Sequence, residues 1–120
     1  MKKIDYEKSS GNLYADLNYA NPEEMQAKSE LARAIYLIIQ GNGMKQKQVG
    51  ELLGLSQPKV SNLLNGRLSG FSLERLTRFL NILDYDVDIF VKPKPKNRTA
   101  HISIISQYSS RPVSIAAKAK

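Results

Sequence analysis

Two short amphipathic segments follow each other almost without a linker between residues 46 and 66, in the stretch QKQVGELLGLSQPKVSNLLNG. Helices joined this closely must cross steeply, which requires a small residue where they touch and a flexible residue at the turn. Gly50 and Gly54 stand at these two places, and the other contact positions are apolar: Val49, Leu55, Val60 and Leu63. The spacing predicts a helix-turn-helix, with helices near residues 46–53 and 57–65. The alternative is an ordinary helical hairpin, in which Gly50 only weakens a helix.

Longer helices are predicted on either side of this motif. Before it, Asn21 is a predicted N-cap, Pro22 suits a first helical position, and apolar residues recur at three- and four-residue steps. After it, Ser72 is a predicted N-cap for a second run with helical spacing. We therefore expect helices near 22–40 and 72–84, and an all-α bundle of four to five helices.

In the segment DVDIFVK, residues 86–92, the apolar residues Val87, Ile89 and Val91 alternate with Asp86, Asp88 and Phe90 until Pro93. This period predicts one short C-terminal β-strand. A strand needs a neighbour, and the sequence leaves three open: the N-terminal arm, the same strand of a second subunit, or another protein.

These features divide the chain into three parts. Residues 1–20 are polar with no sustained period and are predicted to be an N-terminal arm. Residues 21–92 form the predicted helix-turn-helix domain with its terminal strand. Residues 93–120 are predicted to be a basic, flexible tail.

The net charge of +7 is concentrated in two zones. Residues 45–78 hold six basic and two acidic side chains, and residues 89–120 hold seven basic and no acidic ones. A basic zone attracts phosphate groups, but a solvated surface gives the same count. Charge alone therefore leaves nucleic-acid binding and a solvated face as alternatives.

Several classes of function are disfavoured by the residues that the chain lacks. It has no cysteine, which excludes disulfides, thiolate metal sites and a cysteine nucleophile. No apolar run reaches the roughly 18 residues that span a membrane, and the start lacks a signal peptide. The only histidine is His101, and neither a glycine-rich phosphate loop nor paired metal ligands are evident. We expect a cytoplasmic protein that is not an enzyme and has no cofactor or metal.

The outer face of the predicted helix 57–65 carries the expected specificity. The first turn of a recognition helix faces base edges in the major groove of DNA, and its flanks face phosphates. An amide side chain can pair with adenine, and a lysine can bind guanine or phosphate. The predicted base-contacting residues are Gln57, Lys59, Ser61 and Asn62. The alternative is an ordinary solvent-facing helix surface, which is polar as well.

Contacts to the DNA backbone are predicted around both helices of the motif. Gln46 is expected to bind a phosphate or to brace Gln57 across the turn, and Ser56 is a predicted helix cap. The predicted backbone-contacting residues are Lys45, Gln46, Lys47, Ser56 and Arg67. For Arg75 and Arg78 the sequence leaves open whether they bind phosphate or only balance Glu74 and the helix dipole.

Two other binding classes fit the residues less well. Readers of single-stranded RNA stack bases on exposed aromatic side chains, whereas Phe71 and Phe79 fall at core spacing. An interaction module that has lost DNA binding would be expected to carry acids on the outer face of residues 57–62, and none is present there.

These residues resemble the helix-turn-helix of XRE-type, phage-repressor-like proteins, whose pattern appears here as KQKQVG, LGLSQPKVS and LNG. Two positions differ from that pattern: Lys45 stands where Thr or Ser usually caps the helix, and Gly50 replaces a common alanine. The wider frame GNLYADL, NPEEMQAKSELA and GRLSGFSLERLTRFLNILDYDVDI resembles HigA-type antitoxins over residues 11–92.

The resemblance implies a phage-repressor-like fold and a homodimer that represses its own operon at a palindromic operator in double-stranded DNA. For HigBA-like toxin-antitoxin modules it also implies that the chain neutralises a RelE-like ribonuclease toxin, bound by the arm and the helix near 22–40. A stand-alone or phage-derived XRE-type transcriptional regulator without a toxin partner shares the same frame and stays an alternative.

Overall fold

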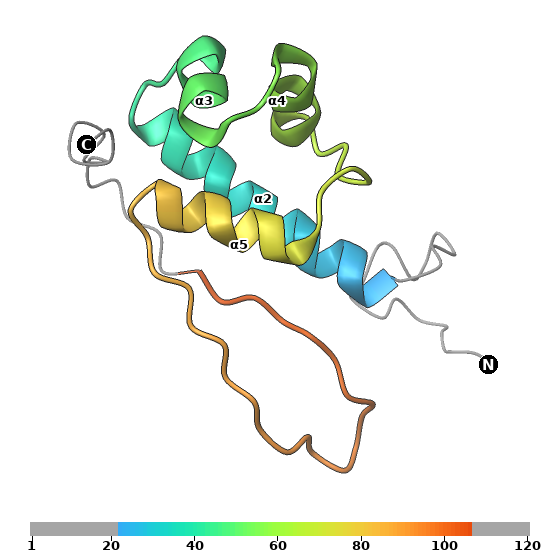
Figure 1. Ribbon diagram of the computed structural model, residues 1–120. Helices are drawn as coiled ribbons and strands as arrows, with labels where there is room; N and C mark the ends of the chain where they lie inside the picture. The colour runs from blue at the N-terminus through green and yellow to red at the C-terminus, as the bar shows by residue number, and fades with distance from the viewer. Residues whose placement is uncertain (1–21, 107–120) are drawn as a thin grey trace.

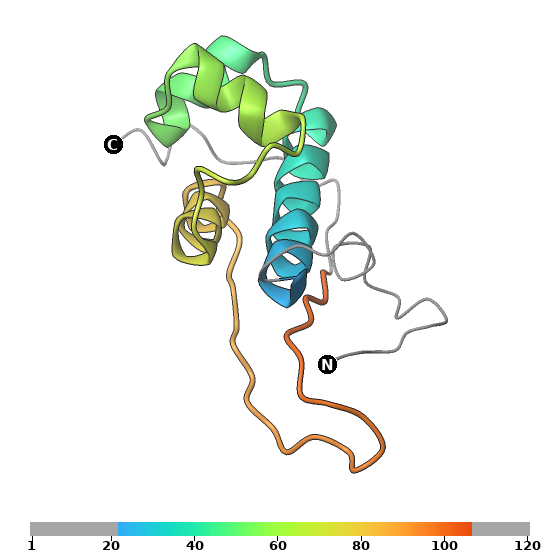
Figure 2. The ribbon, with the colours of Figure 1, turned by 90° about the vertical axis from the view of Figure 1, so that its right-hand side faces the viewer.

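A computed structural model of the chain describes residues 22–106. This part contains four α-helices: α2 (Pro22–Gly41), α3 (Gln46–Leu53), α4 (Gln57–Leu64) and α5 (Leu73–Ile82). In Figure 1, α3 and α4 lie together at one end of the molecule, and α2 and α5 lie below them. The view turned by 90° shows the same arrangement of the two helix pairs (Figure 2). All four helices begin and end within two residues of the predicted bounds, which confirms the all-α class.

Side chains from all four helices meet in a common apolar core. Phe71, in the loop before α5, is only 2% exposed and packs edge to face against Phe79, with 6.0 Å between ring centroids. Burying a side chain of this size contributes about 1.5–3 kcal/mol, so this core holds α3 and α4 onto α2 and α5. Its other members include Leu31, Ile35, Ile38, Val49, Leu53, Val60, Leu63, Leu76 and Leu80.

Local signals explain where these helices begin and end. Gly54 follows α3 with φ of 71°, a left-handed conformation that glycine adopts without the steric cost of a side chain. Ser72 caps α5 as predicted, because its Oγ accepts a hydrogen bond from the Arg75 N–H at 3.0 Å.

The cap predicted from the side chain of Ser56 is wrong. Ser56 occupies the N-cap position of α4, with φ of −69° and ψ of 162°, but its side chain makes no capping hydrogen bond. A capping oxygen accepts from the second or third helical N–H. The second helical residue here is Pro58, which has none, so only the Lys59 N–H could serve, and the Ser56 side chain does not bind it. The Ser56 side chain is therefore exposed at the start of α4 without a capping role.

The C-terminal strand predicted for residues 86–92 is absent from the described part of the chain. Alternating polarity identifies an apolar face but supplies no neighbouring strand, and a strand forms only with one. Residues 84–104, which we call the C-terminal excursion, leave the end of α5 and return to α2 (Figures 1 and 2). The return is fixed at Ile104, whose N–H donates to Glu30 Oε1 at 3.1 Å and whose side chain packs against the core.

The predicted arm at 1–20, the Asn21 cap and the last part of the tail at 107–120 lie outside the described residues. Among the helices from Pro22 to Ile82, none combines the length and the apolar character needed to cross a bilayer.

Candidate nucleic-acid interface

The contact between α3 and α4 depends on Gly50. A Cβ at this position would lie 2.8 Å from the Leu55 carbonyl oxygen and 3.4 Å from Cγ2 of Val60. The first distance is shorter than atoms tolerate, so the backbone of the turn approaches α3 as closely as a glycine permits. The close approach predicted for Gly50 is therefore present, and Val49 and Val60 are fully buried beside it.

A hydrogen bond joins the starts of α3 and α4 on the outer surface. Gln57 Nε2 donates to Gln46 Oε1 at 2.9 Å, and both side chains are exposed. The brace predicted between these two residues is thus present. It fixes the first side chain of α4 relative to α3.

A second group of predicted site residues gathers at the end of α4. Arg67 Nε donates to Asn62 Oδ1 at 2.9 Å, and its Nη2 donates to Ser61 Oγ at 3.5 Å. Asn65 Nδ2 also donates to the Ser61 carbonyl oxygen at 2.8 Å and to its Oγ at 3.3 Å. Asn65 was not among the predicted site residues, although the Asn-Gly pair that ends the motif places it there.

Lys59 lies apart from the other predicted base contacts. Its side chain is half-buried and turned toward the loop after α4, with Nζ 5.5 Å from the centroid of the Phe71 ring. A Cβ on Gly70 would lie 2.8 Å from this Nζ, so the absence of a side chain at Gly70 leaves room for the ammonium. The Arg75 guanidinium also lies over the Phe71 ring, at 5.5 Å from its centroid.

The two arginines whose role the sequence left open have different partners in the structure. Arg78 pairs with Glu74 through Nη2 and Oε2 at 3.0 Å, as one alternative predicted. Arg75 instead packs on Phe71 and Phe79, and within residues 22–106 neither Arg75 nor Lys59 has an ion-pair partner.

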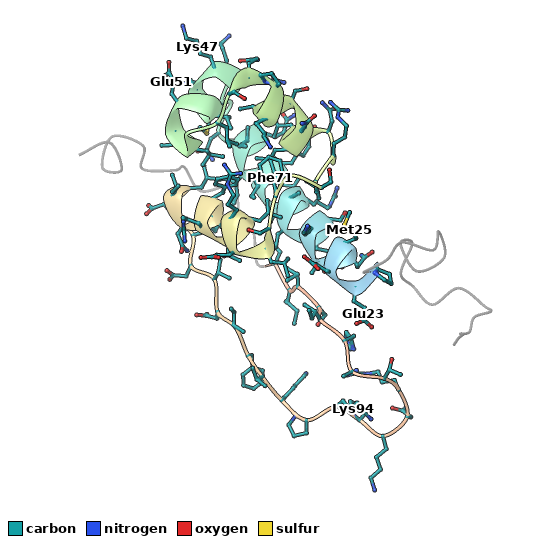
Figure 3. The ribbon with its side chains drawn as sticks, turned by 45° about the vertical axis from the view of Figure 1, so that its right-hand side comes forward. Glu23, Met25, Lys47, Glu51, Phe71 and Lys94 are labelled. Carbon is teal, nitrogen blue, oxygen red and sulfur yellow. The ribbon has the colours of Figure 1, made fainter. Side chains whose placement is uncertain are left out.

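The start of α3 presents basic side chains to solvent. Lys45 and Lys47 are exposed, and Lys47 points away from the core at the end of the molecule that carries α3 and α4 (Figure 3). Lys45 cannot cap the helix with its side chain, but Gln48 Oε1 accepts a hydrogen bond from its N–H at 2.9 Å. This contact supplies the half of a capping box that does not depend on the N-cap side chain. Glu51 is the one acidic residue in α3 and α4.

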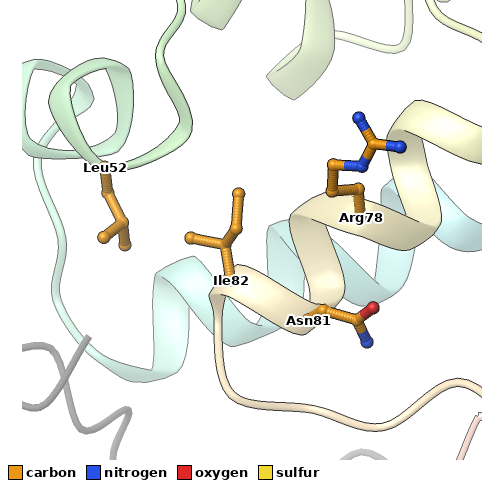
Figure 4. Close-up of a pocket in the computed structure, with 4 residues that line it drawn as sticks. All are labelled: Leu52, Arg78, Asn81 and Ile82. Atoms are coloured by element: carbon orange, nitrogen blue, oxygen red, sulfur yellow. The ribbon is translucent and has the colours of Figure 1, made fainter.

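A shallow pocket between α3 and α5 is separate from this surface. It is lined by Leu52, Arg78, Asn81 and Ile82 (Figure 4). None of the predicted site residues lines it.

The closely packed pair α3 and α4, joined by a short turn and with polar residues on the outer face of α4, defines a helix-turn-helix domain of the kind that DNA-binding regulators carry. Residues 13–92 match the model of a helix-turn-helix domain family. A solved structure named as an XRE family transcriptional regulator is 45% identical, with a TM-score of 0.66 over 70% of this chain and 96% of that chain. A comparison with curated proteins gave no match.

The chain belongs to the XRE family of helix-turn-helix proteins. The predicted XRE-type identity is confirmed, while the closer likeness to HigA-type antitoxins stays a prediction.

Proposed function

We propose that the chain is a sequence-specific DNA-binding repressor in which α4 enters the major groove. The observation that carries this proposal is the outer face of α4. It contains no carboxylate, and Gln57 is held at its start by the bond to Gln46. Because the Gln57 side chain is already held in place before DNA binds, it loses little conformational freedom on binding, which favours affinity.

The predicted contacts fall into two groups in this proposal. Gln57, Ser61 and Asn62 lie on the exposed or half-exposed part of α4 and read base edges. Lys45, Gln46, Lys47, Ser56 and Arg67 surround them and bind phosphates, which position the protein but carry no sequence information. Lys59 belongs to the first group only if its ammonium leaves the Phe71 ring when DNA binds.

A mobility-shift assay with the DNA upstream of the protein's own gene tests the proposal at two salt concentrations. Gln57→Ala should weaken binding to the preferred site by about 1–3 kcal/mol and relax the preference at one base pair. Lys47→Gln, at an exposed position of α3, should weaken binding to all sequences and reduce the salt dependence by about one counterion. Lys94→Ala removes a positive charge at the far end of the molecule (Figure 3) and serves as the control. Failure to retain DNA at low salt, or a preference unchanged by Gln57→Ala, would refute the proposal.

The repressor acts as a homodimer at a palindromic operator. One helix as short as α4 reads only a few base pairs, so useful affinity needs two half-sites about one helical turn, roughly 34 Å, apart. Binding of a single copy to an asymmetric site would contradict this arrangement.

The resemblance to HigA-type antitoxins extends the proposal to a protein partner, a RelE-like ribonuclease toxin. Glu23 is an exposed acid in the first turn of α2, where a basic nuclease would find opposite charge (Figure 3), whereas Glu24 in the same turn is paired with Lys28 at 3.6 Å. Co-expression with an adjacent reading frame should yield a complex that Glu23→Lys weakens. If there is no such frame, or its product does not bind, a stand-alone or phage-derived XRE-type regulator is the correct reading.

A further inference from the structure

Large apolar side chains are exposed along the C-terminal excursion. Ile89, Phe90 and Val91 are 85%, 83% and 88% exposed, with acidic residues before them and Lys92 after them. Their segment is also unpaired along the backbone, because within residues 22–106 no backbone-to-backbone hydrogen bond involves residues 86–92. Unpaired backbone beside exposed apolar side chains is a surface that accepts another strand.

The sequence of this segment is complementary to itself when it is read in the opposite direction. With Ile89 placed opposite a second Ile89, Val87 falls opposite Val91 and Asp86 falls opposite Lys92, while Asp88 opposite Phe90 is the one unmatched pair. Opposite charges and β-branched pairs directly across an antiparallel ladder are the combinations that stabilise it. A shift by one residue would turn the apolar set to the other face of the ladder and separate the charges. An axis at Phe90 would again place an acid, Asp88, opposite Lys92, but it would set Asp86 and Val87 opposite residues at or beyond Pro93, where the strand ends, and so shorten the ladder.

We propose that residues 86–92 pair antiparallel with the same residues of a second copy of this chain, about a two-fold axis at Ile89. This inference rests on the homodimer of the proposed function and names its interface. A strand is then formed only in the dimer, which accounts for its absence from the single chain.

Pro93 selects between the two possible hydrogen-bonding patterns of this pairing. Opposed residues in an antiparallel ladder alternate between pairs that exchange hydrogen bonds and pairs that do not. If the Ile89 pair does not exchange hydrogen bonds, Pro93 also falls at such a position, and its missing N–H costs nothing. The central Cα atoms would then lie about 4.5 Å apart.

The returning half of the C-terminal excursion meets fewer of these conditions. Residues 99–106 of the same chain carry no acid, so they offer nothing opposite Lys92. A second copy places a lysine opposite Asp86 and an aspartate opposite Lys92 at the same time. It also places Val87, which packs against the core, and Val91 of the second copy on one face of the paired strands.

A single-cysteine experiment tests the position of the axis, and the chain suits it because it contains no cysteine. The full-length Ile89→Cys variant should form a disulfide-linked dimer under mild oxidation, because cysteines facing each other at this distance satisfy disulfide geometry. Lys94→Cys, five residues beyond the axis, should remain uncrosslinked. Equal crosslinking of the two variants, or none at Ile89→Cys, would overturn the proposed register.

A charge exchange tests the pairing without a covalent bond. Asp86→Lys and Lys92→Asp should each raise the dimer dissociation constant by about tenfold or more in sedimentation equilibrium, and the double variant should restore it. Lys96→Asp makes the same charge change outside the pair and should have no effect.

The two hypotheses fail separately in this design. If Asp86→Lys and Lys92→Asp leave dimerisation unchanged while the gel shift persists, this interface is wrong and the repressor function stands. If the charge-exchange variants change the dimer dissociation constant as expected but the protein retains no DNA in the gel shift, the dimer interface is supported and the proposed repressor function is wrong.

Discussion

Gly50→Ala distinguishes a tight α3–α4 contact from an ordinary pair of helices, because it should lower the free energy of unfolding in the first case and raise it in the second. In an uncrowded helix, alanine is more favourable than glycine by about 0.8–1.0 kcal/mol. Here the added Cβ would lie 2.8 Å from the Leu55 carbonyl oxygen, and α3 and the turn must move apart to accept it. Forcing an extra methyl group into packed structure costs about 1–3 kcal/mol.

The net expectation is a loss of stability of about 0–2 kcal/mol for Gly50→Ala, since the packing cost exceeds the gain in helix propensity. Gly50→Val should lose more, because it adds two further methyl groups beside Val60 and a β-branched side chain in a helix. The expected order of stability is therefore glycine, alanine, valine. DNA affinity should fall in the same order as α4 is displaced.

Urea and thermal unfolding followed by circular dichroism measure the stability of each variant, and the mobility-shift assay measures its DNA affinity. Glu51→Ala, at an exposed position of the same helix, is the control and should stay within about 0.5 kcal/mol of the original protein. An increase of about 1 kcal/mol for Gly50→Ala would show that the crossing is open and would refute the reasoning.

Further substitutions test individual contacts. Ser72→Ala should reduce the free energy of unfolding by about 1 kcal/mol through loss of the cap on α5, whereas Ser56→Ala should leave it unchanged, as thermal unfolding of both would show. Leu76→Ala opens a cavity at a fully buried position and should cost about 2–5 kcal/mol in urea unfolding; a smaller loss would mean that the core collapses around it. Glu74→Ala breaks only an exposed ion pair, so a change above about 1 kcal/mol would be unexpected.

Structural features could be predicted from the sequence where their physical cause lies within a few neighbouring residues. Helical periodicity, the glycine at the turn and the Ser72 cap each act within a few residues, and the helices were placed correctly for that reason. Gly50 could be recognised because a glycine within an amphipathic helix requires a packing reason.

Features that depend on the surroundings were not predictable in this way. The cap expected from Ser56 is not made: Pro58 removes one of its two possible donors, and the N–H of Lys59 is not used by the Ser56 side chain. The strand expected at 86–92 is not formed because alternating polarity does not show which strand would pair with it. Lys59 was assigned to the outer face from its spacing in α4. Its contact with Phe71 depends on how the loop after α4 folds, which helical spacing does not determine.

The two ends of the C-terminal excursion are held at fixed points, α5 on one side and the Ile104–Glu30 contact on the other. Once both ends of a loop are anchored, doubling its length costs only about 0.6 kcal/mol of closure entropy. Residues 94–97 are exposed, and Lys94 lies far from α4 (Figure 3), so a peptide tag or fluorescent reporter inserted there should leave the fold intact. The molecule thus offers an internal labelling position that leaves both chain termini unaltered.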